Sequence, residues 1–399
     1  MQNSHDVIIV GAGIIGLATA FALQQQHPGR RILVLDKEDR IAFHQSGRNS
    51  GVLHSGIYYK PGSLKSVTCR AGKREMEEFC ERERVPYEIC GKVIVAVNES
   101  ERHALKALYE RGSANGVRCE LIDRTRLLEL EPHSSGIAAI HVPETGIVDY
   151  VQVCDRLASR ITDDGNRVLT GARLLKLTET SSQITAETTA GDFTAAFVVN
   201  CAGLQSDRVA SLAGGSSPAR IIPFRGEYFK LRSEAAYLCR RLIYPVPDPD
   251  FPFLGVHFTR TVSGAVECGP NAVLALAREA YRKTDFGISD LVGTVTYRGF
   301  RRLAARHWRA GAGEMWRSMS KPAFVSALRR LIPKITGSDL LPAPAGIRAQ
   351  AVAPDGSLLD DFSFYETRRV LNVINAPSPA ATASLAVGRM IADKLARRF

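Results

Sequence analysis

The first forty residues show a regular succession of apolar runs and polar turns. Residues 6–10 (DVIIV) are almost wholly apolar, which is typical of a central parallel strand buried on both faces. A glycine-rich turn follows at 11–16, helix-forming residues occupy 17–26, and residues 31–36 (RILVLD) form a second apolar run. The order strand, turn, helix, strand predicts a βαβ unit.

Further along the chain the pattern changes its character twice. Residues 66–85 and 151–163 are helix-like, whereas 92–97, 119–122 and 191–203 are strand-like. From about residue 216 strand-like runs dominate, basic helices follow at 300–334, and the chain closes with a strand, a loop and a long helix. We therefore predict an α/β fold in which a Rossmann-like nucleotide domain is assembled from distant segments, with a substrate domain on a largely antiparallel sheet inserted into it. The predicted nucleotide domain comprises 1–90, 145–215 and 335–399, and the substrate domain comprises 91–144 and 216–334.

Composition narrows the class of protein. Of the 399 residues, 45% are hydrophobic and 23% charged, as in globular enzymes, and no apolar run approaches the roughly 20 residues that a membrane span needs. The chain enters its first strand directly, so we expect no signal peptide and a cytoplasmic location. Its eight cysteines form no Cys-x-x-Cys pair, which favours free thiols in a reducing compartment and argues against a metal site.

Part of the net charge of +11 is concentrated in a single stretch of the chain. Residues 300–334 are dense in arginine with Glu314 as their only acid, and Lys394, Arg397 and Arg398 lie at the C-terminus. Two interpretations stay open: a solvated helical face, or a peripheral contact with a membrane surface or partner. Nucleic-acid binding is not expected, because no binding motif or aromatic-interleaved basic patch accompanies the charge.

The glycine-rich turn carries a dinucleotide-binding fingerprint. Gly11, Gly13 and Gly16 stand between a buried strand and a helix, where they permit a tight turn, a close approach to pyrophosphate and close packing of helix on strand. Asp36 ends the second strand, where an acid accepts hydrogen bonds from a ribose diol and disfavours a 2′-phosphate. Its neighbour Lys37 belongs to the same predicted cofactor-binding set. The fingerprint alone does not separate NAD from FAD.

Other segments resemble those of a known family, and this resemblance distinguishes FAD from NAD. The chain resembles the FAD-dependent D-amino-acid-oxidase-like superfamily and, within it, the L-2-hydroxyglutarate oxidases and dehydrogenases. The segments that carry the resemblance are HQSGRNSGVLHSGIYYKPGSLKS (44–66), CGKVIVAV (90–97), HVPETGIVDY (141–150), VVNCAGLQSDRVA (198–210), IPFRGEYF (222–229), LIYPVPDPDFPFLGVHFTR (242–260), GPNAVLA (269–275), AGIRAQAV (345–352) and NAPSPAATASLAVG (375–388). The resemblance implies FAD as cofactor and an FAD-binding Rossmann-like domain.

The implied reaction is oxidation of L-2-hydroxyglutarate to 2-oxoglutarate, with hydride transfer from Cα to flavin N5. The electrons would pass to an acceptor such as oxygen or a membrane quinone, between which the sequence does not decide. Two alternatives remain: an FAD-dependent amine or amino-acid oxidase on the same fold, and a flavin- or NAD-binding module that acts through a partner with the basic face as its interface.

Three segments are expected along the flavin. In the loop 44–63, Ser46, Asn49 and Ser50 are short hydrogen bonders suited to a polar cofactor edge, and His44 is either a loop hydrogen bonder or a covalent attachment point. Small residues at the end of the strand near 200, and the loop before the last helix, would let the cofactor approach backbone and a positive helix end. The residues of these two segments are Ala202, Gly203, Pro379, Ala380, Ala381 and Thr382.

Oxidation of a 2-hydroxy acid needs a base and cationic anchors. Of nine histidines, His54 and His257 lie inside the resembling motifs and are the candidate bases, with a structural role as the alternative for each. Arg348 matches a position where the superfamily often carries an arginine.

A dicarboxylate calls for a second cation besides Arg348. Arg225 and Lys60 are the candidates for it, and Tyr59 completes the predicted substrate-binding set.

Overall fold

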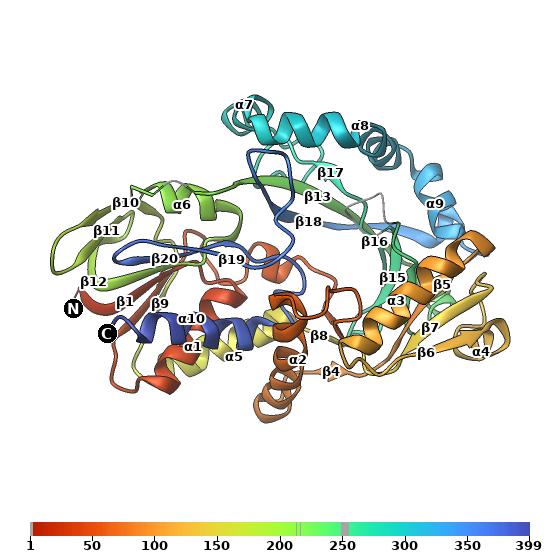
Figure 1. The fold of residues 1–399 in the computed structure, drawn as a ribbon, viewed down its shortest axis with the longest axis horizontal. Helices are drawn as coiled ribbons and strands as arrows, with labels where there is room; N and C mark the ends of the chain where they lie inside the picture. The colour runs from red at the N-terminus through yellow and green to blue at the C-terminus, as the bar shows by residue number, and fades with distance from the viewer. Residues whose placement is uncertain (1–2, 213, 216, 249–254) are drawn as a thin grey trace.

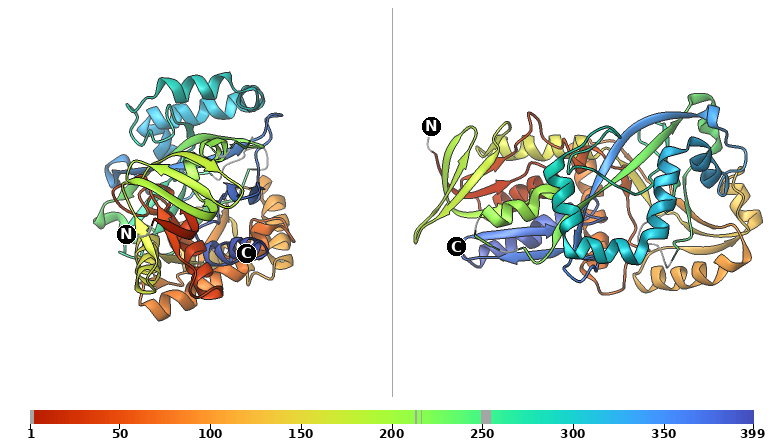
Figure 2. Two further views of the ribbon diagram at one scale, coloured as in Figure 1. Left: turned by 90° about the vertical axis from the view of Figure 1, so that its left-hand side faces the viewer. Right: turned by 90° about the horizontal axis from the view of Figure 1, so that it is seen from above.

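The computed structural model describes residues 3–212, 214–215, 217–248 and 255–399. Residues 249–254, which belong to the resembling segment 242–260, lie outside the described residues. Two large sheets lie side by side along the long axis, the first at the left of Figure 1 and the second at the right. Seen from above in Figure 2, they occupy opposite ends of the molecule.

The first sheet contains the predicted βαβ unit. Its strands run in the order β10 (Leu174–Glu179), β11 (Ile184–Thr188), β12 (Gly191–Asn200), β1 (Ser4–Val10), β2 (Ile32–Leu35) and β9 (Arg167–Leu169), with β20 (Val370–Asn375) beside β12 and β19 (Ser363–Glu366) beside β20. The strands β20, β12, β1, β2 and β9 are parallel to one another. Packed together on one side, as Figure 1 shows, are α1 (Ile14–Gln26), α5 (Tyr150–Asp163) and α10 (Ser384–Ala396).

The parallel strands are hydrophobic on both sides because helices and other chain segments cover both faces. Residues 7–9 of β1 and the whole of β2 are buried, and they pack into two core clusters. The prediction of an α/β fold with a Rossmann-like nucleotide domain is confirmed.

The second sheet is largely antiparallel, as predicted. Its order is β17 (Val273–Leu274), β13 (Arg220–Leu231), β16 (Val266–Gly269), β15 (His257–Arg260), β14 (Leu242–Pro245), β5 (Lys92–Ala96), β7 (Ala138–Val142) and β6 (Glu120–Asp123), with β18 (Leu340–Val352) beside β13. Only β14 and β5 pair in parallel among these described strands. Some neighbours here are consecutive strands, such as β15 and β16, whereas the pairs β14 with β5 and β18 with β13 join stretches that are more than a hundred residues apart.

Strand β18 crosses the division predicted from sequence. That division assigned residues 335–399 to the nucleotide domain, yet β18 hydrogen-bonds with β13 from Arg220↔Val352 to Leu231↔Leu340. A third small sheet, of β3 (Val52–Leu53), β8 (Gly146–Val148) and β4 (Tyr87–Glu88), joins the two parts.

The remaining helices cover the edges. They are α2 (Leu64–Glu83), α3 (Arg102–Ala114), α4 (Arg124–Leu130), α6 (Ser206–Leu212), α7 (Ile288–Thr296), α8 (Arg298–Met319) and α9 (Lys321–Arg329). Helices α7 and α8 form the upper edge of the molecule in Figure 1. Among the described residues, no helix combines the length and apolar character required to cross a bilayer.

Candidate active site

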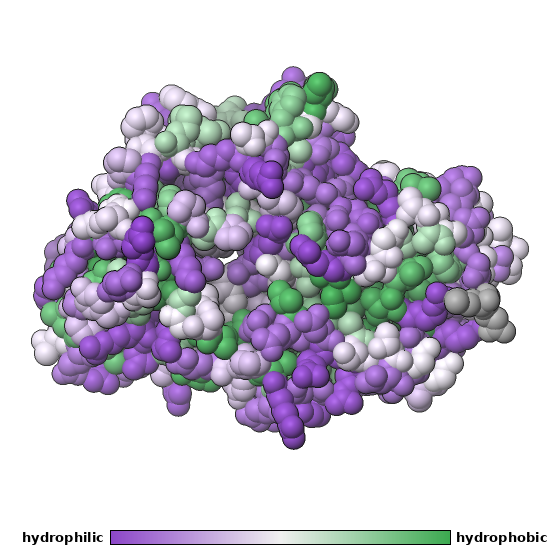
Figure 3. Space-filling model, turned by 180° about the vertical axis from the view of Figure 1, so that it is seen from behind, coloured by the Kyte–Doolittle hydropathy of each residue, from purple (hydrophilic) through white to green (hydrophobic). Residues whose placement is uncertain are grey.

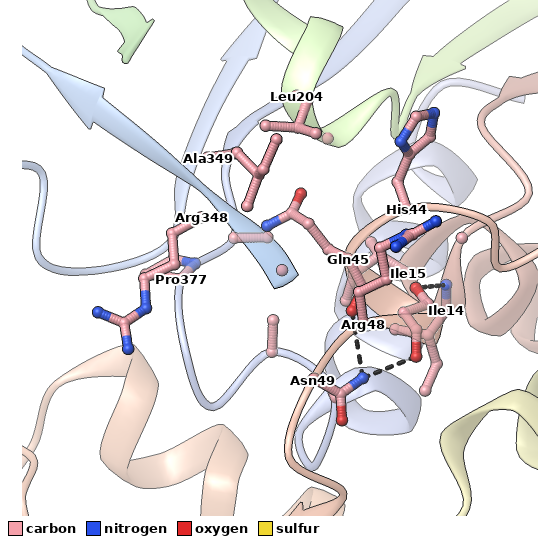
Figure 4. Close-up of a pocket in the computed structure, with 18 of the residues that line it drawn as sticks. Ile14, Ile15, His44, Gln45, Arg48, Asn49, Leu204, Arg348, Ala349 and Pro377 are labelled. Carbon is pink, nitrogen blue, oxygen red and sulfur yellow. Dashed lines mark hydrogen bonds between the residues drawn. The ribbon is translucent and has the colours of Figure 1, made fainter. Parts of the chain in front are cut away.

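A cavity of about 1160 Å³ lies where the two sheets meet. Its wall is built from the glycine-rich turn, the loop that follows β2, the end of β12, strand β18 and the segment before α10. In Figure 4, Arg348 on β18 lies on one side of this space and the loop residues His44, Gln45 and Asn49 on the other. The topology therefore brings segments more than 300 residues apart in sequence around one cavity.

The glycine-rich turn leaves no room for side chains. Gly11 has φ of +109°, and a Cβ there would stand 2.4 Å from the carbonyl oxygen of Cys201. A Cβ at Gly16 would stand 1.9 Å from the carbonyl oxygen of Gly11, so the glycine lets α1 approach β1. Gly11 and Gly13 line the cavity, whereas Gly16 supports the turn from behind. Asp36 also lines it, and its carboxylate accepts a hydrogen bond from Ala12 N at 2.7 Å.

The loop after β2 folds back over the start of α1. Ser46 Oγ accepts a hydrogen bond from Ile14 N at 2.9 Å, in the first turn of the helix. Asn49 Nδ2 donates to the carbonyl oxygens of Gln45 and Ser46, as the dashed lines of Figure 4 show. Ser46, Asn49 and Ser50 all line the cavity. The structure thus places the three predicted loop residues beside the glycine-rich turn.

The segment between β20 and α10 forms the opposite wall. Thr382 is fully buried and ties it to the loop: its hydroxyl donates to Val52 O at 3.1 Å and accepts from His54 N at 3.1 Å. Tyr150 OH lies 2.9 Å from the same hydroxyl. The cavity-lining residues of the two predicted backbone segments are Ala202, Gly203, Pro379, Ala380, Ala381 and Thr382.

An ionic cluster closes the cavity near Asp36. Lys37 Nζ lies 2.9 Å from Glu279 and also contacts Glu38. His44 Nε2 lies 2.9 Å from Glu38, and its Nδ1 lies 2.5 Å from the hydroxyl of Tyr281. Both nitrogens of His44 are therefore engaged in hydrogen bonds, in agreement with the loop hydrogen-bonding interpretation. The lysine supplies the positive charge between the two carboxylates.

His257 lies on β15 and faces the cavity with 5% of its surface exposed. Its Nδ1 donates to Gly255 O at 2.8 Å, which leaves Nε2 as the proton acceptor, and its ring stacks on Tyr244 at 4.0 Å. Burial, together with the charges of Arg348 and Lys92, lowers the pKa of His257 to about 3.

His54 lies in the loop after β3 and lines the same cavity. Its Nδ1 is buried, with no hydrogen-bond partner among the described residues. Burial, followed by the charge of Lys92 and then by His257, lowers the pKa of His54 to about 3. The structure brings the two candidate bases together as neutral imidazoles.

The predicted anchors divide into two groups. Arg348 and Tyr59 line the cavity, and burial lowers the pKa of the arginine and raises that of the tyrosine. Lys60 and Arg225 are not among the lining residues. Lys60 is exposed, and Arg225 is buried in an ion pair with Glu227 at 2.9 Å.

Sequence reasoning missed Lys65 and Lys92. Lys65 lines the cavity, 8% exposed, and its Nζ lies 2.8 Å from Asp360. Lys92 is fully buried directly behind the cavity wall, over the rings of Tyr58 and Tyr244. Its one sequence signal is a lysine that opens the apolar run 92–97.

Residues 6–394 match the family described as FAD dependent oxidoreductase. A curated relative, "L-2-hydroxyglutarate dehydrogenase" of Indibacter alkaliphilus, is 47% identical over 98% of this chain and 99% of its own. The mitochondrial enzyme of that name from Homo sapiens is 45% identical over 100% of this chain and 90% of its own. Among solved structures, L-alpha-glycerophosphate oxidase of Mycoplasma pneumoniae with FAD bound aligns with a TM-score of 0.82 at 22% identity, over 100% of this chain and 95% of that one.

The chain belongs to the FAD-dependent oxidoreductases. Within them it is a member of the family formed by the L-2-hydroxyglutarate dehydrogenases. The cavity agrees with this assignment, because Gly11 and Gly13 line it with bare backbone and because Asp36 borders the same space.

Proposed function

We propose that this protein oxidises L-2-hydroxyglutarate to 2-oxoglutarate. The observation that carries the proposal is the placement of two neutral imidazoles, His54 and His257, beside the buried cation Arg348 in one cavity. A proton acceptor and a carboxylate anchor are the two groups that a 2-hydroxy acid requires from the protein.

The glycine-rich turn and the loop after β2 would hold the cofactor. Gly11 and Gly13 would face the pyrophosphate, Asp36 the ribose, and Ser46 and Asn49 the polar edges. Lys37, Ser50, Ala202, Gly203 and residues 379–382 would complete this wall. When bound, FAD supplies a two-electron acceptor for the hydride that leaves Cα.

The protein's own groups would bind the substrate and remove its hydroxyl proton. Arg348 can grip the carboxylate next to the hydroxyl with two parallel hydrogen bonds. Lys65 would meet the second carboxylate, since it lines the cavity close to Tyr59 and its ion-pair partner Asp360 is largely exposed. His257 would accept the hydroxyl proton at Nε2, because its Nδ1 proton is held by Gly255 O.

Anaerobic mixing with a panel of acids tests this assignment. The purified yellow protein should lose its flavin absorption with L-2-hydroxyglutarate and keep it with D-2-hydroxyglutarate, glycine, and D- or L-amino acids. Bleaching by an amine and not by L-2-hydroxyglutarate would establish the amine-oxidase alternative instead.

We further propose a peripheral membrane contact through the face of α7 and α8. Large apolar side chains are exposed along this face, as at Trp308 (63%) and Met319 (70%), and Figure 3 shows hydrophobic surface at the same upper edge. The apolar members of this face are Phe286, Ile288, Val292, Val295, Trp308, Met315, Trp316 and Met319. Exposed arginines stand among them at 301, 302, 306 and 309.

Helices that lie in a bilayer interface expose large apolar side chains together with nearby cations, as α7 and α8 do. Glu314, the only acid of 300–334, is buried and paired with Arg317, so it does not offset these charges. The C-terminal cations Lys394, Arg397 and Arg398 do not join the face, because the C-terminus lies beside the first sheet, away from α7 and α8 (Figure 1). Such a contact would suit delivery of electrons to a membrane quinone.

Vesicle flotation tests the contact. The protein should float with anionic vesicles at low salt and detach at high salt. The double change Trp308→Ser and Trp316→Ser should abolish flotation, whereas Tyr237→Ser, at an exposed aromatic of η4 (Ser233–Leu238), should not. If the unaltered protein does not float with anionic vesicles, the face is an ordinary solvent-exposed surface and the proposed membrane contact is wrong.

A further inference from the structure

A lysine with no counter-ion among the described residues is buried behind the cavity that both candidate bases line. Lys92 opens β5, which pairs with β14 on one side and β7 on the other, and none of its surface is exposed. Among the described residues no hydrogen-bond acceptor contacts its Nζ. The ammonium lies 4.6 Å from the ring centre of Tyr58 and 4.9 Å from that of Tyr244, both of which line the cavity.

Among the described residues, the only groups besides burial that act on the pKa of Lys92 are the thiols of Cys69 and Cys90. Burial raises the pKa of the Cys69 thiol to about 12 and that of the Cys90 thiol to about 11, and it raises the pKa of the Tyr58 and Tyr244 phenols. These four groups therefore stay uncharged. The titratable groups that interact with Lys92, its two histidines or Arg348 are Tyr58, Tyr228, Tyr244, Cys69, Cys90, His54, His257 and, on α8, Glu314.

An isolated lysine buried in this manner is costly, so a structural role explains it poorly. Burial lowers the pKa of Lys92 to about 7, which shows how unfavourable its charge is at this position. The same charge is the second cause, after burial, of the lowered pKa of His54, and it also acts on His257. A methionine would fill the same space without this penalty.

We propose that Lys92 is a positioning residue of the reaction, whose buried ammonium holds the neighbouring imidazoles of His54 and His257 in their neutral, proton-accepting form. This inference rests on the proposed oxidation of a dicarboxylate. A doubly negative substrate would attract protons onto the imidazoles, and the positive charge that Lys92 carries below its pKa of about 7 opposes that uptake. Lys92 touches neither the cavity nor the substrate, so it acts through the two histidines.

The test compares Lys92→Met, Lys92→Arg and Lys73→Met in the holoenzyme. Lys73 serves as the control because it is also buried, at 8% exposed against 0% for Lys92, but pairs with Glu77 on α2 and does not line the cavity. The first measurement is the pH dependence, from 3 to 7, of flavin reduction at saturating L-2-hydroxyglutarate, a range that spans the expected titration of both imidazoles. The second is the histidine NMR titration of the complex with 2-oxoglutarate, which requires no turnover.

Removal of the charge should raise the pKa of both imidazoles, so the acid side of the rate profile should move to higher pH. A shift of about one pH unit is expected for Lys92→Met, the size of a single-charge effect across a few ångströms of protein. Lys92→Arg keeps the charge and should restore the wild-type profile, and Lys73→Met should match the wild type.

A Lys92→Met profile and histidine titration that superimpose on those of the wild type would overturn the inference. Absence of reduction by L-2-hydroxyglutarate in the wild type would instead reject the proposed function. The two failures are therefore distinguishable.

Discussion

Replacement of Lys92 by methionine should stabilise the fold, by an amount that depends on pH in a defined way. Burial lowers the pKa of this lysine from 10.5 to about 7, a difference of about 3.5 pH units. At about 1.4 kcal/mol per unit, the buried ammonium costs on the order of 5 kcal/mol of folding free energy near neutral pH. Methionine has a similar length and no charge, so Lys92→Met should recover most of this cost.

The sign of the pH dependence follows from proton binding. Below pH 7 both the folded and unfolded wild type carry the proton, so the advantage of Lys92→Met is constant. Between pH 7 and 10.5 the unfolded chain binds one more proton than the folded one, and wild-type stability rises with pH. The advantage of the variant should therefore shrink to about 2 kcal/mol at pH 9 and vanish near pH 10.5.

Thermal unfolding followed by flavin fluorescence, at pH 6, 7.5 and 9 and at one fixed excess of FAD, measures the effect. The fixed excess matters because bound cofactor adds its own stabilisation. Lys73→Met is the control. The ammonium of Lys73 pairs with Glu77, so its removal should not raise the melting temperature, and the difference from the wild type should not shrink above pH 7. Two results would refute the reasoning. One is a melting temperature of Lys92→Met equal to that of the wild type at pH 6; the other is a difference between the two melting temperatures that grows toward pH 9.

Four further outcomes follow from the site. His257→Asn should slow flavin reduction by about 10²–10⁴-fold with FAD retained, with His54→Asn as the comparison; if neither slows it, the base lies elsewhere. Since the pKa of His257 is about 3, kcat/KM should stay level from pH 8 to 5.5, where a histidine at 6.5 would be mostly protonated. Arg348→Met should lower kcat/KM by about 30-fold or more, through loss of a buried carboxylate partner. Lys65→Met should raise KM for L-2-hydroxyglutarate and leave that for L-lactate unchanged, and equal effects on both would remove Lys65 from the binding set.

The residues proposed to hold the cofactor could be predicted mostly from local sequence. The turn at Gly11 and Gly13 adjoins its strand and helix in sequence, so short-range rules decide its shape. Asp36 follows from the length of the βαβ unit. The loop residues Ser46 and Asn49 came from a family resemblance, and the structure places both beside the first turn of α1.

The proposed second carboxylate anchor, Lys65, could not be predicted from the residues alone. Lys60 and Lys65 lie five residues apart at the transition from a loop to α2, where no period relates sequence position to direction. The structure turns Lys65 into the cavity and leaves Lys60 in solvent. Arg225 has a guanidinium that could bind a carboxylate, but it forms an ion pair with Glu227 on the same strand and does not line the cavity.

By itself, the sequence determined the βαβ unit, the type of cofactor turn, the antiparallel character of the second sheet and the motif histidines, because each depends on neighbours within a few residues or on a shared family pattern. Only the tertiary structure decided that β18 joins β13, which carries Arg348 to the cavity across more than a hundred residues of intervening chain. It alone decided that Lys92 lies behind that wall, where the part of the chain that the structure describes offers its Nζ no hydrogen-bond partner. The physical reason is that burial and electrostatic coupling are sums over contacts between distant segments, and those contacts exist only after the two sheets have come together.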